Sequence, residues 1–188
     1  MSKKGKLFVI SGSSGVGKGT LIKKFLEKNP EIKLSISFTT RLPRPKEVDG
    51  INYFFTNKDD FESAIEKGEF LEWAKFSENY YGTKSAYVEK TLNNGENLLL
   101  EIETQGALQV MKKFPDAEFI FILPPSIEVL ESRLRGRGTE TEEAIQKRLS
   151  VVKQEFETSK LFTHRVINDN IEDALNELQK IFYGQENV

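Results

Sequence analysis

A glycine-rich segment near the start of the chain has the residue types of a phosphate-binding loop. It reads Gly12-Ser13-Ser14-Gly15-Val16-Gly17-Lys18-Gly19-Thr20. Glycines let the backbone curl so that successive N–H groups point at an anion, and the following helix adds the positive end of its dipole. Lys18 supplies a mobile charge for the outer phosphates of a nucleoside triphosphate. A chance lysine in a glycine-rich turn explains neither the glycine spacing nor the position of the lysine.

The flanking residues place this loop between a strand and a helix. The apolar run Leu7–Ile10 precedes it and an amphipathic segment, residues 21–26, follows it, which is the context that such a loop requires. Gly19 takes the place directly after Lys18 where a hydroxyl usually meets magnesium, and the hydroxyl comes one residue later at Thr20. The same Lys-Gly-Thr ending occurs in kinases that phosphorylate nucleoside monophosphates. Thr20 then binds the metal, holds a metal-bound water or caps the helix.

Composition limits the class of protein. The chain has 188 residues, enough for one sizeable core with small inserted lobes, and its 30% charged and 38% hydrophobic residues are typical of a soluble globular enzyme. A net charge of −2 argues against a broad nucleic-acid-binding surface. The absence of cysteine excludes disulfides and thiolate metal sites. No apolar stretch could span a bilayer and the first residues lack a signal-peptide pattern, so we expect a cytoplasmic protein with no membrane contact.

Apolar runs that alternate with helical patterns predict an α/β fold. The expected strands are Leu7–Ile10, Leu98–Ile102, Phe119–Leu123 and Val166–Ile167. Continuous apolar strands of this kind indicate a parallel sheet covered by helices on both faces. After the first helix, the expected helices in this part of the chain are Ser126–Arg135 with Ser126 as N-cap, Glu142–Leu161 with a capping box from Thr139, and Ile171–Phe182.

Two segments interrupt this alternation. Residues 37–94 are rich in proline and tyrosine, and they contain two expected helices, Asp59–Lys67 and Ser85–Leu92, so we interpret them as an inserted lobe of mixed strand and helix. Residues 133–148 are charged, rich in glycine and threonine and short of apolar anchors, which indicates a second, smaller insertion.

The inserted segments closely resemble the guanylate kinase family. The resemblance is carried by Ser37-Phe38-Thr39-Thr40-Arg41-Leu42-Pro43-Arg44-Pro45, Glu47-Val48-Asp49-Gly50-Ile51-Asn52-Tyr53, Phe70-Leu71-Glu72-Trp73-Ala74, Asn79-Tyr80-Tyr81-Gly82-Thr83 and Arg135-Gly136-Arg137-Gly138-Thr139-Glu140-Thr141. The match runs in order from about Leu7 to Asn168 and covers nearly the whole chain.

This resemblance implies both a fold and an activity. The fold is a P-loop NTPase-type parallel sheet flanked by helices, with an inserted mixed α/β GMP-binding lobe and a short lid. It forms one domain, 1–188, with a core at about 1–36, 95–128 and 158–188, the lobe at about 37–94 and the lid at about 129–157. The implied activity transfers the terminal phosphoryl group of ATP to GMP with Mg²⁺, giving ADP and GDP in purine nucleotide metabolism.

Two arginines around a proline are candidates for the acceptor phosphate. Arg41 and Arg44 lie three residues apart, so a stiff turn could present both guanidinium groups to one phosphate. A solvated basic pair is the alternative. In the family these positions, with Tyr53 and Tyr81, hold the phosphate of GMP, and Arg41 is counted here among the catalytic residues.

Glu72 is the candidate for recognition of the base. Guanine presents N1–H and its exocyclic amine side by side, and one carboxylate matches both donors, whereas adenine would leave a partly buried carboxylate unpaired at a cost of roughly 1–3 kcal/mol or more. An exposed acid at the edge of a helix or strand is the alternative. Ser37 and Thr83 resemble the family's hydroxyl contacts to the base.

Two further acids follow the Leu98–Ile102 strand, at the edge where parallel sheets bind ligands. Glu103 is assigned by resemblance to the guanine amine, although the family usually has the shorter aspartate there. Glu101 is assigned to magnesium, through water. Caps for a helix beginning near Gly106 are a competing interpretation of both.

The remaining candidates serve ATP and the transferred phosphoryl group. By resemblance Arg133 and Arg137 meet ATP phosphates and Arg148 reaches both substrates, so these three are candidate catalytic residues with Lys18. Arg135 is interpreted as a solvated neighbour. Asn168 matches the family position near adenine, and a helix N-cap is an equal alternative.

Two rival functions remain open. One is a catalytically silent guanylate-kinase-like interaction module, against which Gly12, Gly17, Lys18 and the arginine-bearing lid argue. The other is a related kinase with a different phosphorylated acceptor, which the pair Glu72 and Thr83 disfavours. The sequence gives no indication of the oligomeric state.

Overall fold

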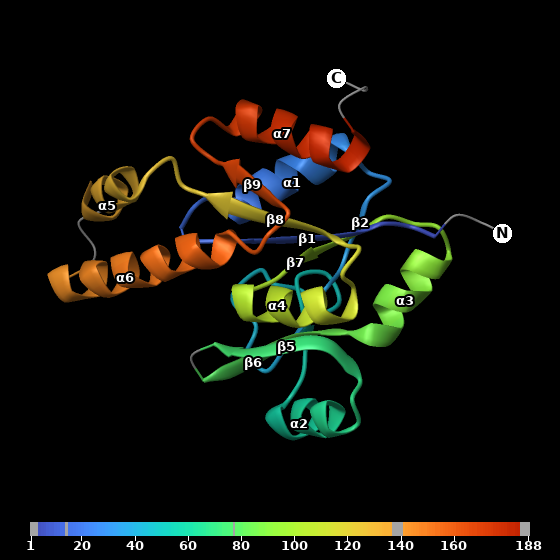
Figure 1. The fold of residues 1–188 in the computed structure, drawn as a ribbon. Helices are drawn as coiled ribbons and strands as arrows, with labels where there is room; N and C mark the ends of the chain where they lie inside the picture. The colour runs from blue at the N-terminus through green and yellow to red at the C-terminus, as the bar shows by residue number, and fades with distance from the viewer. Residues whose placement is uncertain (1–3, 14, 77, 137–140, 185–188) are drawn as a thin grey trace. The chain divides into compact units, whose positions relative to one another are not determined.

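The structure is a computed structural model that describes residues 4–13, 15–76, 78–136 and 141–184. The chain forms two compact units: the first unit holds residues 1–9 and 31–118, and the second unit holds residues 10–30 and 119–188. The division passes through the buried strand β1 (Leu7–Gly12), which therefore contributes to both units. Figure 1 shows the order of the elements along the chain.

A five-stranded sheet has the strand order β2-β7-β1-β8-β9. In the first unit, β2 (Lys33–Leu34) runs parallel to β7 (Leu98–Glu101), with Lys33 opposite Leu98. In the second unit, β8 (Glu118–Leu123) runs parallel to β9 (His164–Ile167), with Ile120 opposite His164. The consecutive apolar residues of β1, β7 and β8 are buried, as in a sheet covered on both faces. The expected α/β fold with a parallel sheet flanked by helices is confirmed.

The second unit also contains the helices α1 (Lys18–Lys28), α5 (Ile127–Gly136), α6 (Glu142–Ser159) and α7 (Ile171–Tyr183). Helices α1 and α7 pack against each other (Figure 1), with the rings of Phe25 and Phe182 4.6 Å apart. Asn29, at the C-terminal end of α1, accepts hydrogen bonds from Tyr183 at 2.9 Å and Gln179 at 3.2 Å, and donates to the carbonyl of Phe25. The end of α1 is therefore fastened to the last helix.

The first unit adds a four-stranded sheet with the order β4-β3-β6-β5. Its strands are β3 (Phe38–Thr39), β4 (Phe54–Phe55), β5 (Phe70–Phe76) and β6 (Asn79–Lys84), and β5 and β6 are antiparallel. Helix α2 (Lys58–Glu66) is preceded by Asn57 as N-cap, whose side chain accepts a hydrogen bond from the backbone N–H of Asp60. Phe61 of α2 stacks on Phe70 with ring centroids 4.3 Å apart, which gives this sheet a small core of its own.

The helices α3 (Ser85–Asn93) and α4 (Thr104–Lys113) complete the first unit. The five helices that the sequence bounded all occur, with ends within two residues of the expected positions. Ser126 caps α5 as expected, since it accepts a hydrogen bond from Val129 at 3.2 Å, whereas Thr139 lies outside the described residues. Strand β2 and the bounds of α4 were not expected. Within the described ranges, no helix has the length and apolar character needed to cross a membrane.

Candidate functional site

The glycine-rich loop connects β1 to α1 in the second unit, as the sequence predicts. Gly15 and Gly17 have φ angles of 81° and 87°, in the left-handed region that glycine tolerates best. Gly12 lies so close to β8 that a Cβ atom there would be 2.6 Å from the carbonyl oxygen of Ile122. The glycines therefore have two separate roles: Gly15 and Gly17 allow the sharp turn of the loop, and Gly12 allows its close contact with the neighbouring strand.

The loop has free polar groups where an anion would sit. The Ser13 side chain is 2% exposed, and its Oγ has no hydrogen-bond partner in the described part of the chain. The first turn of α1 contains no acidic residue, so its N-terminal N–H groups keep their positive potential. Lys18 is half-buried at this turn, while Gly19 and Thr20 are exposed. Ser14, also expected to bind ATP, lies outside the described residues.

Asn168 braces the phosphate loop. Its Nδ2 donates a hydrogen bond to the carbonyl of Val16 at 2.7 Å, and its backbone N–H donates to Leu123 at 2.8 Å. The alternative interpretation of Asn168 as the N-cap of α7 is wrong, because Asn170 is the cap and accepts a hydrogen bond from the backbone N–H of Glu172. The loop contact was missed in the sequence, where the two residues are far apart.

The arginines expected on the lid fall in or near α5 and α6. Arg133 lies in α5 and Arg148 in α6, but the placement of their side chains is not described, and Arg137 lies outside the described residues. Arg135 donates hydrogen bonds to Glu131 within α5 and to Glu142 at the start of α6. Its interpretation as a solvated neighbour is therefore incomplete, because it joins the two helices, although it remains partly exposed.

The first unit brings together three of the residues predicted for the acceptor phosphate. The Arg41 guanidinium carbon lies 5.4 Å from the centre of the Tyr53 ring, and the Tyr53 and Tyr81 rings are 6.1 Å apart. The Nε of Arg41 is buried and has no hydrogen-bond partner among the described residues. Arg44 is exposed beside this cluster.

Glu47 holds Arg41 in place and was missed by the sequence analysis. Its carboxylate accepts hydrogen bonds from Arg41 at 2.9 and 3.0 Å and from the backbone N–H of Arg44 at 2.7 Å. The bond to Glu47, opposed by burial and supported by Tyr81, raises the pKa of the Arg41 guanidinium. The same bond lowers the pKa of Glu47, and the N–H of Arg44 adds to this effect. Both partners therefore stay charged, and one terminal nitrogen of Arg41, Nη2, donates to both oxygens of the carboxylate.

The predicted base reader is a buried carboxylate. Glu72 on β5 is 3% exposed and Thr83 on β6 is 1% exposed, and the Thr83 hydroxyl donates to Glu72 Oε1 at 2.6 Å. The alternative of an exposed acid is wrong. Burial raises the pKa of Glu72 to about 7, and the charge of Glu103 adds to this, while hydrogen bonds from Thr83 and the charge of Lys113 act in the opposite direction. The carboxyl is thus poised for a ligand that supplies hydrogen-bond donors.

The other site residues that the sequence predicts in the first unit are Glu103, Glu101 and Ser37. Glu103 is exposed and lies close enough to influence Glu72. It occupies the N-cap position of α4 without a side-chain capping bond among the described residues, so the capping alternative has no support there. Glu101, at the end of β7, contributes to the raised pKa of Tyr53, after burial and Tyr81. Ser37 is half-buried directly before β3.

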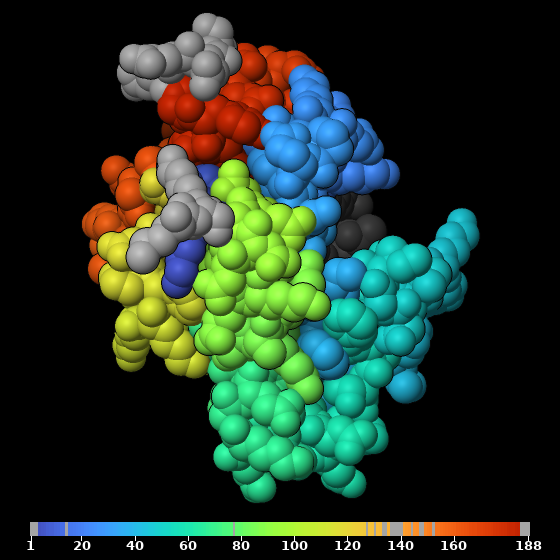
Figure 2. All heavy atoms as spheres, turned by 90° about the vertical axis from the view of Figure 1, so that its right-hand side faces the viewer, coloured from blue at the N-terminus to red at the C-terminus, as the bar shows by residue number. Residues whose placement is uncertain are grey.

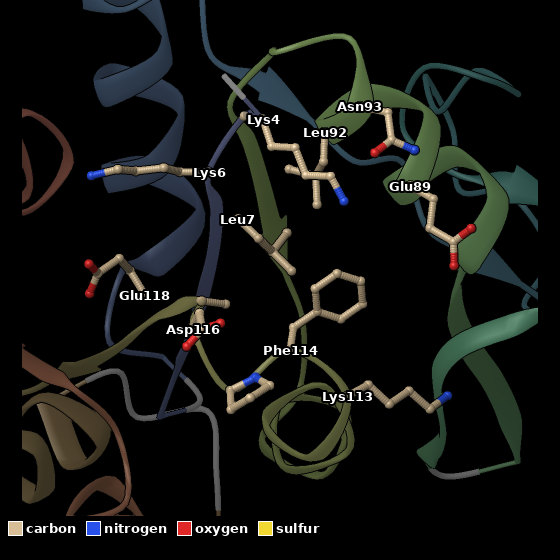
Figure 3. Close-up of a pocket in the computed structure, with 13 residues that line it drawn as sticks. Lys4, Lys6, Leu7, Glu89, Leu92, Asn93, Lys113, Phe114, Asp116 and Glu118 are labelled. Atoms are coloured by element: carbon tan, nitrogen blue, oxygen red, sulfur yellow. The ribbon is translucent and has the colours of Figure 1, made fainter. Parts of the chain in front are cut away.

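A separate cavity of about 690 Å³ in the first unit contains none of the predicted site residues. It lies between the residues around Lys4 and Lys6, helix α3 and the end of α4 (Figure 3). In Figure 2 the dark blue residues before β1 are seen between the light green of α3 and the yellow segment that follows α4. Charges of both signs line it, among them Lys4, Glu89 and Asp116.

The phosphate loop and the parallel sheet together define a P-loop nucleotide-binding protein. Comparison with known proteins narrows this class. The family model for guanylate kinase matches residues 4–185. The guanylate kinase of Halalkalibacterium halodurans is 50% identical over 179 residues, which cover 95% of this chain and 88% of that protein. The guanylate kinase of Clostridioides difficile is 49% identical over 98% of this chain and 90% of its own length.

A solved structure agrees with these relatives. The crystal structure of guanylate kinase from Anaplasma phagocytophilum is similar with a TM-score of 0.78 and 27% identity, over 99% of this chain and 88% of that one. The chain belongs to the guanylate kinase family.

Proposed function

We propose that this protein transfers the terminal phosphoryl group of ATP to GMP, with Mg²⁺, to give ADP and GDP. The observation that supports the acceptor best is the arrangement of β6. Tyr81 and Thr83 lie two residues apart on this strand, so they share one face of the sheet. Thr83 bonds the buried Glu72, and Tyr81 lies with Tyr53 and Arg41. One face therefore carries both a group suited to a base and a group suited to a phosphate.

The choice of guanine follows from the hydrogen-bonding pattern of the base. An ionised Glu72 accepts from N1–H and the exocyclic amine of guanine, and Ser37 and Glu103 are the further base contacts in this proposal. Adenine does not present this pair of donors, so the buried carboxylate would keep only its hydrogen bond from Thr83. The lost bonds cost about 1–3 kcal/mol, or roughly a ten- to hundredfold preference for GMP. Arg41, Arg44, Tyr53 and Tyr81 would hold the acceptor phosphate.

The donor is proposed to bind the loop of residues 12–20. Backbone N–H groups and the α1 N-terminus would hold the phosphates, with Lys18 as the movable charge. Asn168 holds this loop and is the candidate near adenine. Arg133, Arg137 and Arg148 are proposed to shield the transferred group. The acceptor is already an anionic oxygen, so alignment and charge neutralisation do the work without a strong general base.

Thr20 in the second unit and Glu101 in the first unit each carry an oxygen ligand of the kind that a magnesium ion takes. Such an ion usually takes only one or two protein oxygen ligands. Thr20 offers an exposed hydroxyl in the first turn of α1 and Glu101 offers a carboxylate at the end of β7. The ion would supply positive charge to the phosphate oxygens. In this proposal Thr20 and Glu101 hold the water molecules bound to the ion.

The GMP-binding lobe and the lid are proposed to have the bounds expected from the sequence. The enzyme is proposed to work in the cytoplasm.

A coupled assay with ATP, Mg²⁺ and each of GMP, AMP, CMP and UMP tests the proposal. We expect GMP to be the preferred acceptor by at least about tenfold, and Lys18→Met to lower kcat by about a hundredfold or more while leaving the unfolding transition unchanged. A folded protein that phosphorylates none of the four would instead be the silent interaction module. Preference for another acceptor would point to the rival kinase.

A further inference from the structure

One face of α4 contacts the strand that carries Glu72. Gly106, Gln109 and Lys113 lie at positions i, i+3 and i+7 of this helix, so they share a side of it. Strand β5 is at the edge of the four-stranded sheet, where backbone groups on its outer side lack a neighbouring strand. The helix therefore meets β5 at the edge that the sheet leaves open, and its packing against β5 is extensive.

Two side chains of this face bond the backbone on both sides of Glu72. The Gln109 amide donates to the Trp73 carbonyl at 2.6 Å and accepts from the Trp73 N–H at 3.2 Å, as a neighbouring strand would. The Lys113 ammonium donates to the carbonyls of Leu71 at 2.6 Å and Phe70 at 3.2 Å. Figure 3 shows Lys113 extending from the end of α4 toward β5. The residues before and after Glu72 are thus fixed from outside the sheet.

The third position of this face sets the space for the carboxylate itself. A Cβ atom on Gly106 would lie 2.2 Å from Glu72 Oε2 and 3.0 Å from its Cδ. The φ angle of Gly106 is not in the left-handed region, so its backbone does not require glycine. Glycine inside a helix is less stable than alanine. Space for Glu72 is therefore the reason that the structure offers for glycine at this position.

We propose that this face of α4 determines acceptor specificity: Gly106 sets the position of the Glu72 carboxylate, and Gln109 and Lys113 fix the strand that carries it. The inference rests on the proposed function of Glu72 as the group that binds guanine. Gly106, Gln109 and Lys113 are positioning residues, because they act through Glu72 and not through contact with the nucleotide.

The first test is Gly106→Ala, measured by steady-state kinetics with GMP and ATP varied separately. The added methyl group must push the carboxylate aside by about 1 Å to reach a normal contact. We expect KM for GMP to rise at least tenfold, KM for ATP to stay within about twofold, and preference for GMP over AMP to fall. Gln105→Ala is the matched control, since Gln105 is an exposed residue of the same turn. Equal rises in both KM values would overturn the proposal.

A compensating substitution separates steric positioning from a general loss of structure. Glu72→Asp shortens the side chain by one carbon–carbon bond, about 1.5 Å, which leaves room for the alanine methyl group. We expect the KM for GMP of Gly106→Ala combined with Glu72→Asp to lie at least threefold below the product of the two single effects. Fully multiplicative effects would contradict the proposed contact.

If Gly106→Ala does not fold, Gln109→Ala tests whether α4 positions Glu72, because this substitution removes atoms without creating a clash. We expect a threefold to tenfold rise in KM for GMP with KM for ATP unchanged, and an unchanged KM for GMP would overturn the proposal. Glu72→Gln, measured in parallel, distinguishes a failure of the positioning role of α4 from a failure of the proposed role of Glu72 in binding guanine. If Glu72→Gln impairs GMP use and the α4 variants do not, only the positioning role fails. If Glu72→Gln also leaves GMP use intact, the proposed base reader is wrong.

Discussion

Replacing Glu72 by glutamine should make the protein more stable at alkaline pH while impairing its use of GMP. Burial, with a contribution from the charge of Glu103, raises the pKa of this carboxyl from 4.5 to about 7. Between these values the folded protein binds more protons than the unfolded chain, so the free energy of unfolding falls as the pH rises through this window. Since one pKa unit corresponds to about 1.4 kcal/mol, ionising Glu72 destabilises the fold by about 3 kcal/mol.

Urea unfolding of the parent and of Glu72→Gln at pH 5 and pH 8 measures this effect. The stability difference between the two proteins should shift in favour of the variant by about 2–3 kcal/mol from pH 5 to pH 8. An amide N–H₂ left without an acceptor offsets about 1 kcal/mol at both pH values. For a chain of this length, a net gain of about 2 kcal/mol at pH 8 raises Tm by about 4–8 °C.

The control for this measurement is Glu89→Gln. Glu89 is an exposed acid on α3, and its replacement should give the same stability difference at both pH values. A Glu72→Gln difference that does not change between pH 5 and pH 8 would refute the reasoning, because it would mean that Glu72 does not carry a raised pKa in the folded protein. The effect of Glu72 on stability and its effect on GMP binding would then have separate causes.

The remaining predictions concern binding. In this proposal GMP binds the ionised form of Glu72, so KM for GMP in the parent should fall as the pH rises from 6 to 8. The fall should be about tenfold larger than in Glu72→Gln, where only the phosphate of GMP titrates. Parallel pH profiles of the two proteins would show that the carboxylate does not bind the base. Glu47→Gln weakens the two hydrogen bonds that hold Arg41 and should raise KM for GMP threefold to tenfold without changing KM for ATP, a split that steady-state kinetics detects. Asn168→Ala removes the bond to the Val16 carbonyl and should raise KM for ATP about fivefold, with KM for GMP unchanged; an effect on GMP alone would exclude the bracing role.

The fold was predictable to the extent that single segments determine their own structure. The apolar runs of β1, β7 and β8 and the loop glycines predict a strand–loop–helix unit and a parallel sheet, and both occur. Helix α4 was not bounded because Gly106 lies in its first turn, and Ala107 and Val110 are among the few apolar residues of its buried side. Strand β2 is two exposed residues long and has no apolar pattern to detect.

The sequence allowed the site residues themselves to be predicted, but not the residues that bond to them. The phosphate loop, Arg41 and Glu72 stood out in the sequence, and the structure gives Glu72 the burial that its proposed role needs. The residues that hold them did not stand out. Asn168 is 152 positions from Val16, and Gln109 is 36 positions from Trp73, so only the folded chain brings each pair together. Glu47 lies near Arg41 in sequence, but an acid beside arginines is common on any surface.

The connection between α1 and α7 has a consequence for synthesis of the protein. Asn29, at the end of α1, is held by Gln179 and Tyr183, which lie among the last residues described. During translation the N-terminal helix must therefore wait for nearly the whole chain to leave the ribosome before its final contacts form. Ending the chain before residue 171 would remove α7 and, with it, the packing that steadies the helix directly after the loop.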